Sequence, residues 1–317
     1  MKNLKNKLKN YLLLDRNRRK IKEIQEDDEF EKNRIAAELI RNTHSIEKGL
    51  SINNPRLGFG HSKQKEMMGE INELKKSQSN YHQEVIKMAI GALVEYIEFH
   101  KEKKYKDEFI EKINDFLNEN SMYIDTIKYG GTMTLLRSEM KFNIEEIEKF
   151  FNTRHSIRDF EDTEVNNEDL KKALRLAQRT PSACNRQGVR AYVVQKDKIR
   201  DLNGWIEGIG GFSDSVNKYI LITAKVSTYR QDENYQYIVS ASMYVAYLTL
   251  TLHLYGLGAC VVQRPVIYSK KWDNLRKKWE IPKDEQIICL LGVGNLKESC
   301  KVPVSHRLEN SEMIKFL

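Results

Sequence analysis

The feature that most constrains the fold is a change of hydrophobic pattern near residue 150. Before this point, apolar residues recur three and four positions apart in highly charged stretches, and no strand-like run is evident. Such spacing is typical of amphipathic helices. Helices are predicted at 29–42, 62–77, 82–103 and 143–151. The first half of the chain is therefore expected to be all-helical.

After residue 160, predicted helices alternate with short runs rich in β-branched residues. The helices are expected at 169–179 and 234–254. The strands are expected at 189–195, 218–224, 259–263 and 286–294. A chain of 317 residues suits about two domains, so the change of pattern indicates a helical region followed by a region that mixes helices and strands.

Positive charge is concentrated at the N-terminus. The chain carries 53 Lys and Arg against 45 Asp and Glu, a formal net charge of +8. Residues 1–22 contain nine basic side chains and one acidic one, so the other 295 residues are balanced. Nucleic-acid-binding proteins usually present a basic face, so this class is not expected. The basic leader is compatible with contact to a membrane surface or a partner, but a solvated helix is the simpler interpretation.

Several features favour a cytoplasmic protein. The apolar run at 11–14 is too short for a secretory signal, and no small-residue cleavage site follows it. The four cysteines form no CxxC pair and no zinc-site spacing, so free thiols and no metal site are expected. They are Cys184, Cys260, Cys289 and Cys300.

The segment 234–263 contains no formally charged side chain over thirty residues. Its length would allow a membrane span, but hydroxyl and amide side chains lower its hydrophobicity. No aromatic belt with flanking positive charge lies at its ends. A buried helix, in a core or at a subunit interface, is the better interpretation. Gly256 is expected to end this helix before the strand that follows.

A stretch rich in glycine, 42–60, is predicted to be a structured loop. His44, Glu47 and Lys48 are titratable, but they lack the further ligands that a metal or hydrolytic site needs. Two interpretations stay open. The stretch is either a helix cap followed by a loop that packs on the second domain, or a flap that covers a functional site.

Three clusters carry candidate chemistry. The first is "TRHSIRDF" at 153–160, which by itself is compatible with a helix start that Thr153 or Ser156 caps. The second is the loop "TPSACNRQG" at 180–188, just before a predicted strand, where backbone N–H groups and amides can bind the edge of a flat heterocycle. The third is "GNLKESCKVPVSHRL" near the C-terminus. Its glycines lack the third position and the following helix of a dinucleotide-binding fingerprint, so the Rossmann fold is excluded.

In this order, "RHSIRDF", "TPSACNRQ", "GLGACVVQ" and an arginine after the last apolar strand resemble the nitroreductase family of FMN-dependent oxidoreductases. The resemblance covers about residues 146–317 and leaves 1–145 as a helical N-terminal extension. It implies an α+β, nitroreductase-like fold with a central mixed or antiparallel sheet flanked by helices. It also implies a homodimer that binds FMN in two interface clefts. Reducing equivalents would pass from NAD(P)H to a small nitro, quinone or other conjugated acceptor by a ping-pong mechanism.

The resemblance assigns the basic residues to the flavin. Arg154 and Ser156, with His155 between them, match positions that hold the FMN phosphate and ribityl chain. A guanidinium suits a phosphate because it donates two parallel hydrogen bonds. Arg158 matches a basic position near the N1 and O2 edge of the ring, where a cation favours the reduced form. Arg307 corresponds to an arginine of a C-terminal loop that closes on the phosphate.

The remaining assignments concern the ring. Ser305 stands where many members place a lysine. The loop beside the ring, supplied by the partner chain, would contain Pro181, Ser182, Ala183, Asn185 and Gln187. The segment near the flavin N5 would contain Val261, Val262, Gln263 and Arg264. No residue is predicted to be a catalytic acid, base or nucleophile.

This chain also departs from the family pattern. Gly188 and Val189 follow Gln187, where members commonly place proline and an aromatic residue, and Cys184 and Arg186 are unusual. Other classes therefore stay open: a dehalogenase, an azoline dehydrogenase, a flavin-consuming enzyme like that of cobalamin biosynthesis, a non-catalytic FMN-binding protein, or a membrane-docked accessory protein.

Overall fold

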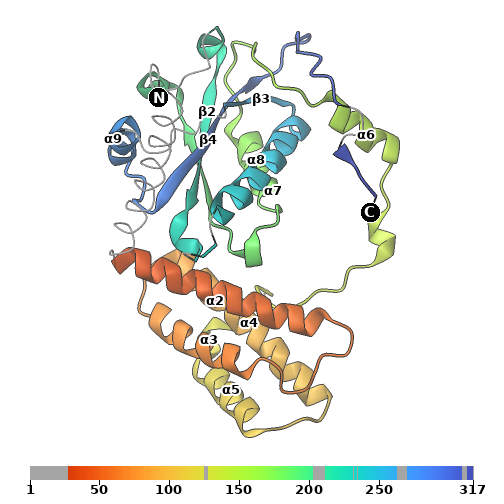
Figure 1. Ribbon diagram of the computed structural model, residues 1–317, viewed down its shortest axis with the longest axis vertical. Helices are drawn as coiled ribbons and strands as arrows, with labels where there is room; N and C mark the ends of the chain where they lie inside the picture. Colours follow the sequence, from red (N-terminus) through yellow and green to blue (C-terminus); the bar gives the residue numbers. More distant parts are fainter. Residues whose placement is uncertain are drawn as a thin grey trace, which may run out of the picture.

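The computed structural model of the protein describes residues 28–124, 128–202, 211–230, 232–233, 235–262, 270–308 and 313–316. The basic leader 1–22, Gln263 and Arg264 lie outside these residues. The described chain has a helical part and a part built on a four-stranded sheet (Figure 1). The predicted α+β class is therefore confirmed. The domain boundary at 145/146 stays a prediction.

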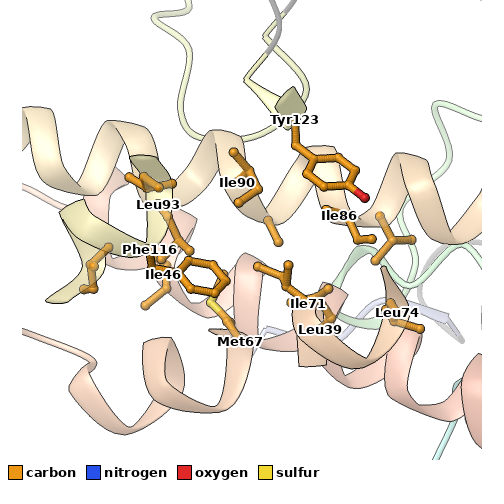
Figure 2. Close-up of a cluster of buried hydrophobic side chains, with 14 of the residues drawn as sticks. Leu39, Ile46, Met67, Ile71, Leu74, Ile86, Ile90, Leu93, Phe116 and Tyr123 are labelled. Carbon is orange, nitrogen blue, oxygen red and sulfur yellow. The ribbon is translucent and has the colours of Figure 1, made fainter. Parts of the chain in front are cut away.

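The helical part has its own hydrophobic core. Its elements are α2 Asp28–Ser51, α3 His61–Leu74, α4 Asn80–Glu102, α5 Glu108–Glu119 and the short 3₁₀ helix η1 Ser121–Tyr123. Side chains from all these elements meet in one cluster, in which Leu39, Met67, Ile86 and Phe116 are buried (Figure 2). The sequence reading missed α5, although Ile110, Ile113 and Phe116 have helical spacing and all point into this core.

The predicted loop at 42–60 is only partly a loop, because α2 continues to Ser51. The helix ends before Asn54, whose φ of 57° is not helical, and before Pro55. Gly49 lies within the helix, and only glycine leaves room there, because the ring of Phe59 occupies the space where a Cβ would lie. The remaining turn packs on α4: the Tyr96 hydroxyl donates to the carbonyl of Phe59 at 2.9 Å. The loop thus packs within the helical part rather than on the second domain, and the flap interpretation finds no support.

Glu47 in α2 anchors the chain where it leaves the helical part. Its carboxylate accepts a hydrogen bond from the backbone of Gly131 at 3.1 Å and lies 3.5 Å from the His44 ring. Glu95 in α4 accepts from the backbone of Thr132 at 2.8 Å. These titratable groups therefore have a structural role.

A connection that includes η2 Arg137–Met140 and α6 Ile144–Thr153 joins the two parts and stands away from the helical bundle in Figure 1. Asn143 caps α6 by accepting from the backbone of Glu145 at 3.0 Å. None of the residues of α6 is buried, and the preceding Phe142 is 72% exposed. The described part of the chain therefore does not cover the apolar side chains of this amphipathic helix.

The second part is an antiparallel sheet between two layers of apolar side chains. Its helices and strands are α7 Asn167–Ala177, β1 Val189–Val194, β2 Lys218–Lys225, α8 Gln236–Leu254, β3 Leu257–Val262, α9 Lys270–Lys278 and β4 Glu285–Asn295. Its 3₁₀ helices are η3 Ala183–Asn185, η4 Lys196–Leu202, η5 Ser213–Ser215 and η6 Val226–Thr228. The strand order is β1-β2-β4-β3, and every pairing is antiparallel.

Both faces of the sheet are covered. One face packs against α7 and α8, where Leu170 and Leu248 meet Ile220 and Leu291. The other face packs on a second cluster that includes Leu221. All eight residues of β2 are buried, which explains why its sequence shows an apolar run rather than alternation.

The long uncharged helix predicted at 234–254 is α8, which lies across the sheet in Figure 1. Among the described helices it is long and apolar enough to cross a membrane by length and composition. One face is buried, with Leu248 and Leu252 fully covered, whereas Val239 and Leu254 are 49% and 57% exposed. The interpretation as a core helix holds for one face only.

Candidate functional site

The motif "RHSIRDF" lies beside strand β3. Ser156 forms an isolated parallel bridge with Ala259, and the backbone of Ile157 donates to the Ala259 carbonyl at 3.0 Å. Ile157 is buried and holds the segment on the sheet. The helix-start interpretation is wrong, because Thr153 ends α6 and the next helix is capped by Asn166.

Two arginines and a histidine gather at this edge. None of Arg154, His155 and Arg158 forms an ion pair with another described residue. Arg158 donates a hydrogen bond to the carbonyl of Ser156, at 3.5 Å. The pKa of His253, at the end of α8, is lowered by burial and then by the charges of Arg154 and His155. The edge is thus a local region of positive charge.

His253 belongs to the same neighbourhood, and the sequence reading missed it. Its ring contacts the ring of Phe150 at a centroid distance of 5.2 Å, and its Nε2 lies 2.9 Å from the Thr153 hydroxyl. Cys260 in β3 is also close: burial raises the pKa of its thiol, and the charge of Arg158 opposes this.

The loop 180–188 has an unusual backbone. Cys184, Asn185 and Gln187 have φ values of 50°, 56° and 50°, in the left-handed region that disfavours residues other than glycine. The loop is held by the Ser182 hydroxyl, which accepts from the backbone of Gln187 at 3.0 Å. The backbone of Ala183 in turn donates to the Ser240 hydroxyl of α8 at 3.4 Å. Strained residues held in this way occur often at binding sites.

Two departures from the family pattern have a structural explanation. Arg186 is buried and forms a two-point ion pair with Glu233, at 2.6 and 2.7 Å. Its guanidinium also lies 4.6 Å from the ring centroid of Tyr229. A side chain at Gly188 would collide with Thr228, so the larger residues common in the family do not fit here. These residues fix the loop.

Within one chain the two candidate halves are far apart. The loop 180–188 contacts α8 near Ser240, whereas Thr153, directly before "RHSIRDF", contacts the other end of the helix at His253. Thirteen residues of helix at 1.5 Å per residue separate these contacts by about 20 Å. A single chain therefore does not bring Arg154 and Gln187 together.

The other predicted residues lie in three places. Val261 and Val262 lie in β3, partly buried, opposite Leu291 and Leu290 of β4. In the C-terminal segment, Ser305 has a φ of 47° and its carbonyl accepts a hydrogen bond from Arg307, which is exposed. Pro181 is also exposed.

These observations define a class of protein. It has an α+β domain with a cationic edge on its sheet and a strained loop. Residues 152–210, which contain both motifs, match the nitroreductase family. The predicted resemblance is thereby confirmed for this segment, which is preceded by an additional N-terminal helical region. No curated protein matches the chain.

The chain is also similar to solved structures. One is an FMN-dependent nitroreductase from Clostridium difficile R20291, with 28% identity over 53% of this chain and 96% of that chain, at a TM-score of 0.45. Another is a nitroreductase family protein from Clostridium difficile 630, with 22% identity over 55% and 98%, at 0.44. A third is a nitroreductase family protein from Streptococcus pneumoniae TIGR4, with 18% identity over 54% and 100%, at 0.45.

Proposed function

We propose that the protein is an FMN-dependent oxidoreductase that transfers reducing equivalents from NAD(P)H to a small conjugated acceptor. The observation that carries the proposal is the sheet edge with the guanidinium groups of Arg154 and Arg158, and with His155 between them, in a segment that matches the nitroreductase family. Cations without a carboxylate partner fit a dianionic phosphate, so the residues present suit this cofactor.

Each residue has a separate task in this proposal. Arg154, Ser156 and Arg307 bind the phosphate and the adjoining chain, while Arg158 stabilises negative charge at the edge of the ring. The strained loop with Ser182 and Gln187 presents backbone and amide groups to the ring. The chemistry that bound FMN supplies is two-electron exchange, first with the nicotinamide and then with the acceptor, in ping-pong order.

We further propose a cytoplasmic homodimer. The separation of about 20 Å along α8 supports a site that takes "RHSIRDF" from one chain and the loop 180–188 from its partner. The exposed face of α8, with Met243 and Tyr247 at 37% and 40%, supplies an apolar surface for a second copy. Phe150 of α6 contacts His253 at the C-terminal end of α8. The uncovered side chains of α6 therefore lie next to this end of α8.

Anaerobic titration of the purified protein tests the function. A yellow protein whose flavin absorbance is bleached by NADH or NADPH, and restored by a quinone, is expected. A colourless protein that takes up no added FMN contradicts the proposal. A yellow protein that neither nicotinamide bleaches identifies an FMN-binding protein without this activity.

A further inference from the structure

The segment 133–151, which joins the helical part to the sheet part, is exposed along almost its whole length. Every residue from 133 to 149 is exposed, and Phe151 is 56% exposed. In Figure 1 the segment runs from the helical bundle to α6 along the outside of the molecule. We call it the connecting arm. It precedes residues 152–210, the segment that matches the family, and is therefore an addition in this chain.

The connecting arm is rich in apolar side chains although so little of it is buried. Eight large apolar side chains, each between 44% and 84% exposed, lie within it: Met133, Leu135, Leu136, Met140, Phe142, Ile144, Ile147 and Phe151. Their exposed area is roughly 800 Å² per copy, at about 150 Å² or more for a fully exposed side chain of this size. The largest apolar patch of a monomer is usually about 300 to 600 Å², so this surface is typical of an interface.

The two ends of the connecting arm are fixed to the rest of the chain. Before it, the backbone N–H of Thr132 donates to Glu95 at 2.8 Å. After it, the Thr153 hydroxyl lies 2.9 Å from the ring of His253. The second half of the arm is a helix that Asn143 caps. The arm is therefore held in place and presents its apolar side chains outwards instead of burying them on its own chain.

A second apolar face begins where the connecting arm ends. Phe150 contacts His253, at the C-terminal end of α8, with a centroid distance of 5.2 Å. Exposed apolar side chains then follow one side of α8 at helical spacing: Leu254, Tyr247, Met243 and Val239. The helix from Gln236 to Leu254 contains no formally charged residue. The arm and this face of α8 are thus adjacent apolar surfaces, and the described part of a single chain covers neither.

The charges of the connecting arm indicate the kind of partner. It carries three basic and four acidic side chains: Arg137, Lys141, Lys149, Glu139, Glu145, Glu146 and Glu148. Anionic membranes attract clusters of basic residues, which this nearly neutral arm does not offer. A second copy of the chain offers the uncharged face of α8, and two-fold symmetry makes each contact occur twice. Two arms bring roughly 1,600 Å² of surface, which is about what a stable interface buries.

We propose that the connecting arm clasps a second copy of this chain, and that the arm of each copy packs on the exposed face of α8 of the other. Association then removes the apolar side chains of both arms from water. The proposal rests on the proposed homodimer and not on the flavin chemistry. It goes beyond that homodimer because residues 133–142, which precede α6 and the segment that matches the family, become a principal contact.

Photo-cross-linking of the full chain tests which copy the connecting arm contacts. Phe142→p-benzoylphenylalanine is produced on light and on heavy nitrogen, and the two preparations are diluted together, concentrated and irradiated. Mass spectrometry should find position 142 joined to the peptide that contains α8, with one light and one heavy partner. The same photoreactive residue in place of Lys171, on the exposed side of α7, is the control and should give no link between copies.

Matched variants measure the contribution of the apolar side chains. Leu136→Ser combined with Phe142→Ser should raise the dissociation constant of the dimer at least about tenfold, because two apolar side chains no longer leave water. Lys141→Ser, in the same arm, should leave this constant unchanged. Sedimentation at a series of protein concentrations measures it. All three side chains are exposed in the single chain, so circular dichroism should show the parent's fold. The cross-link decides if the double variant unfolds.

The proposal is overturned if cross-links from position 142 stay within one copy, or if the double variant dimerises as tightly as the parent. Either result, in a parent that is a dimer, contradicts the role of the arm and leaves the homodimer standing. A parent that is a monomer at all concentrations contradicts both, and its binding to phosphatidylcholine vesicles would identify a lipid surface as the occupant. A colourless protein that passes both tests of the arm contradicts the flavin chemistry alone.

Discussion

The guanidinium of Arg186 is buried against the carboxylate of Glu233, and this ion pair ties the loop 180–188 to the chain just before α8. Arg186 also donates to the carbonyls of Ala183 and Thr228, at 3.0 and 3.1 Å. The strained backbone of the loop therefore depends on one buried cation. Glu233, which the sequence reading did not single out, supplies its counter-charge.

Glu233→Gln is expected to destabilise the protein by roughly 3 kcal/mol, because it leaves a buried guanidinium without its counter-charge. Urea unfolding at pH 7 measures the change. Glu168→Gln, which breaks an exposed pair with Lys171, is the control and should change stability little. Equal stability of the two variants would show that the pair does not hold the loop.

The ion pair between Arg186 and Glu233 should also make the stability of the protein depend on pH. The hydrogen bond from Arg186 lowers the pKa of Glu233 in the folded protein. A carboxyl group with a lowered pKa stabilises the fold at pH above its unfolded pKa, and this stabilisation is lost as the pH falls through the folded pKa. The difference in unfolding free energy between the parent and Glu233→Gln should therefore shrink below about pH 4.5. A difference that stays constant between pH 7 and pH 3 contradicts this assignment.

Glu70, in α3, should make the stability of the protein depend on pH in the opposite direction. Burial raises its pKa to about 7, while the amide of Asn42, at 3.2 Å from both oxygens, partly opposes this. The folded state then holds a proton that the unfolded state releases, so stability falls as the pH rises from about 4.5 to about 7. Glu70→Gln should remove this slope and stabilise the protein at pH 8 by about 1 to 3 kcal/mol. Unfolding curves at pH 5 and pH 8 measure both effects, and parallel curves for the two proteins would exclude them.

Sequence periodicity located the regular elements well where the pattern was long or the strand fully buried. The helix predicted at 82–103 is α4, and the strand predicted at 218–224 is β2 with one more residue. The short helices α5 and α9 were missed. The glycines and the proline at 42–60 predict a loop, but α2 continues to Ser51, with Gly49 packed against the ring of Phe59.

The candidate site was predictable only in part. The motifs gave the residues, and the structure places Arg154 and Ser156 beside β3. Spacing along the chain does not give distances across α8, so the separation of the two halves had to come from the fold. The burial of Arg186 also has no local signal, because its partner Glu233 lies 47 residues away.

The four cysteines, all of them free thiols, should react at two different rates. Cys260 and Cys289 are each 4% exposed, and burial raises the pKa of Cys289 to about 12. Cys184 and Cys300 are partly exposed. Iodoacetamide at pH 8 should therefore label two sites quickly in the native protein and four after denaturation, because the thiolate is the reactive species. Peptide mass spectrometry identifies the sites; rapid labelling of Cys289 in the native protein would be the contrary result.

Assembly can be tested on α8. Tyr247→Asp places a charge in the exposed apolar face, and we expect it to shift the protein towards a monomer and to lower its flavin content, since each site would lose the partner's loop. Light scattering and the ratio of absorbance at 450 and 280 nm measure the two effects. Lys171→Asp, on the exposed face of α7, is the control and should leave both unchanged. A parent protein that is a monomer with bound FMN contradicts the proposed dimer.

The basic residues at the sheet edge and in the C-terminal segment should give two distinct phenotypes. Arg154→Ala or Arg307→Ala removes a charge-assisted contact to the phosphate, worth about 1.5 to 3 kcal/mol, so FMN affinity should fall roughly ten- to a hundredfold. Arg158→Ala should keep most of its flavin but lower the reduction potential, because the reduced ring loses a nearby cation. Equilibrium dialysis and a redox titration separate these outcomes. Arg175→Ala, at an exposed position of α7, is a control for loss of positive charge. If Arg154→Ala and Arg307→Ala bind FMN as tightly as the parent, these arginines do not hold the phosphate, and the flavin assignment of "RHSIRDF" is wrong.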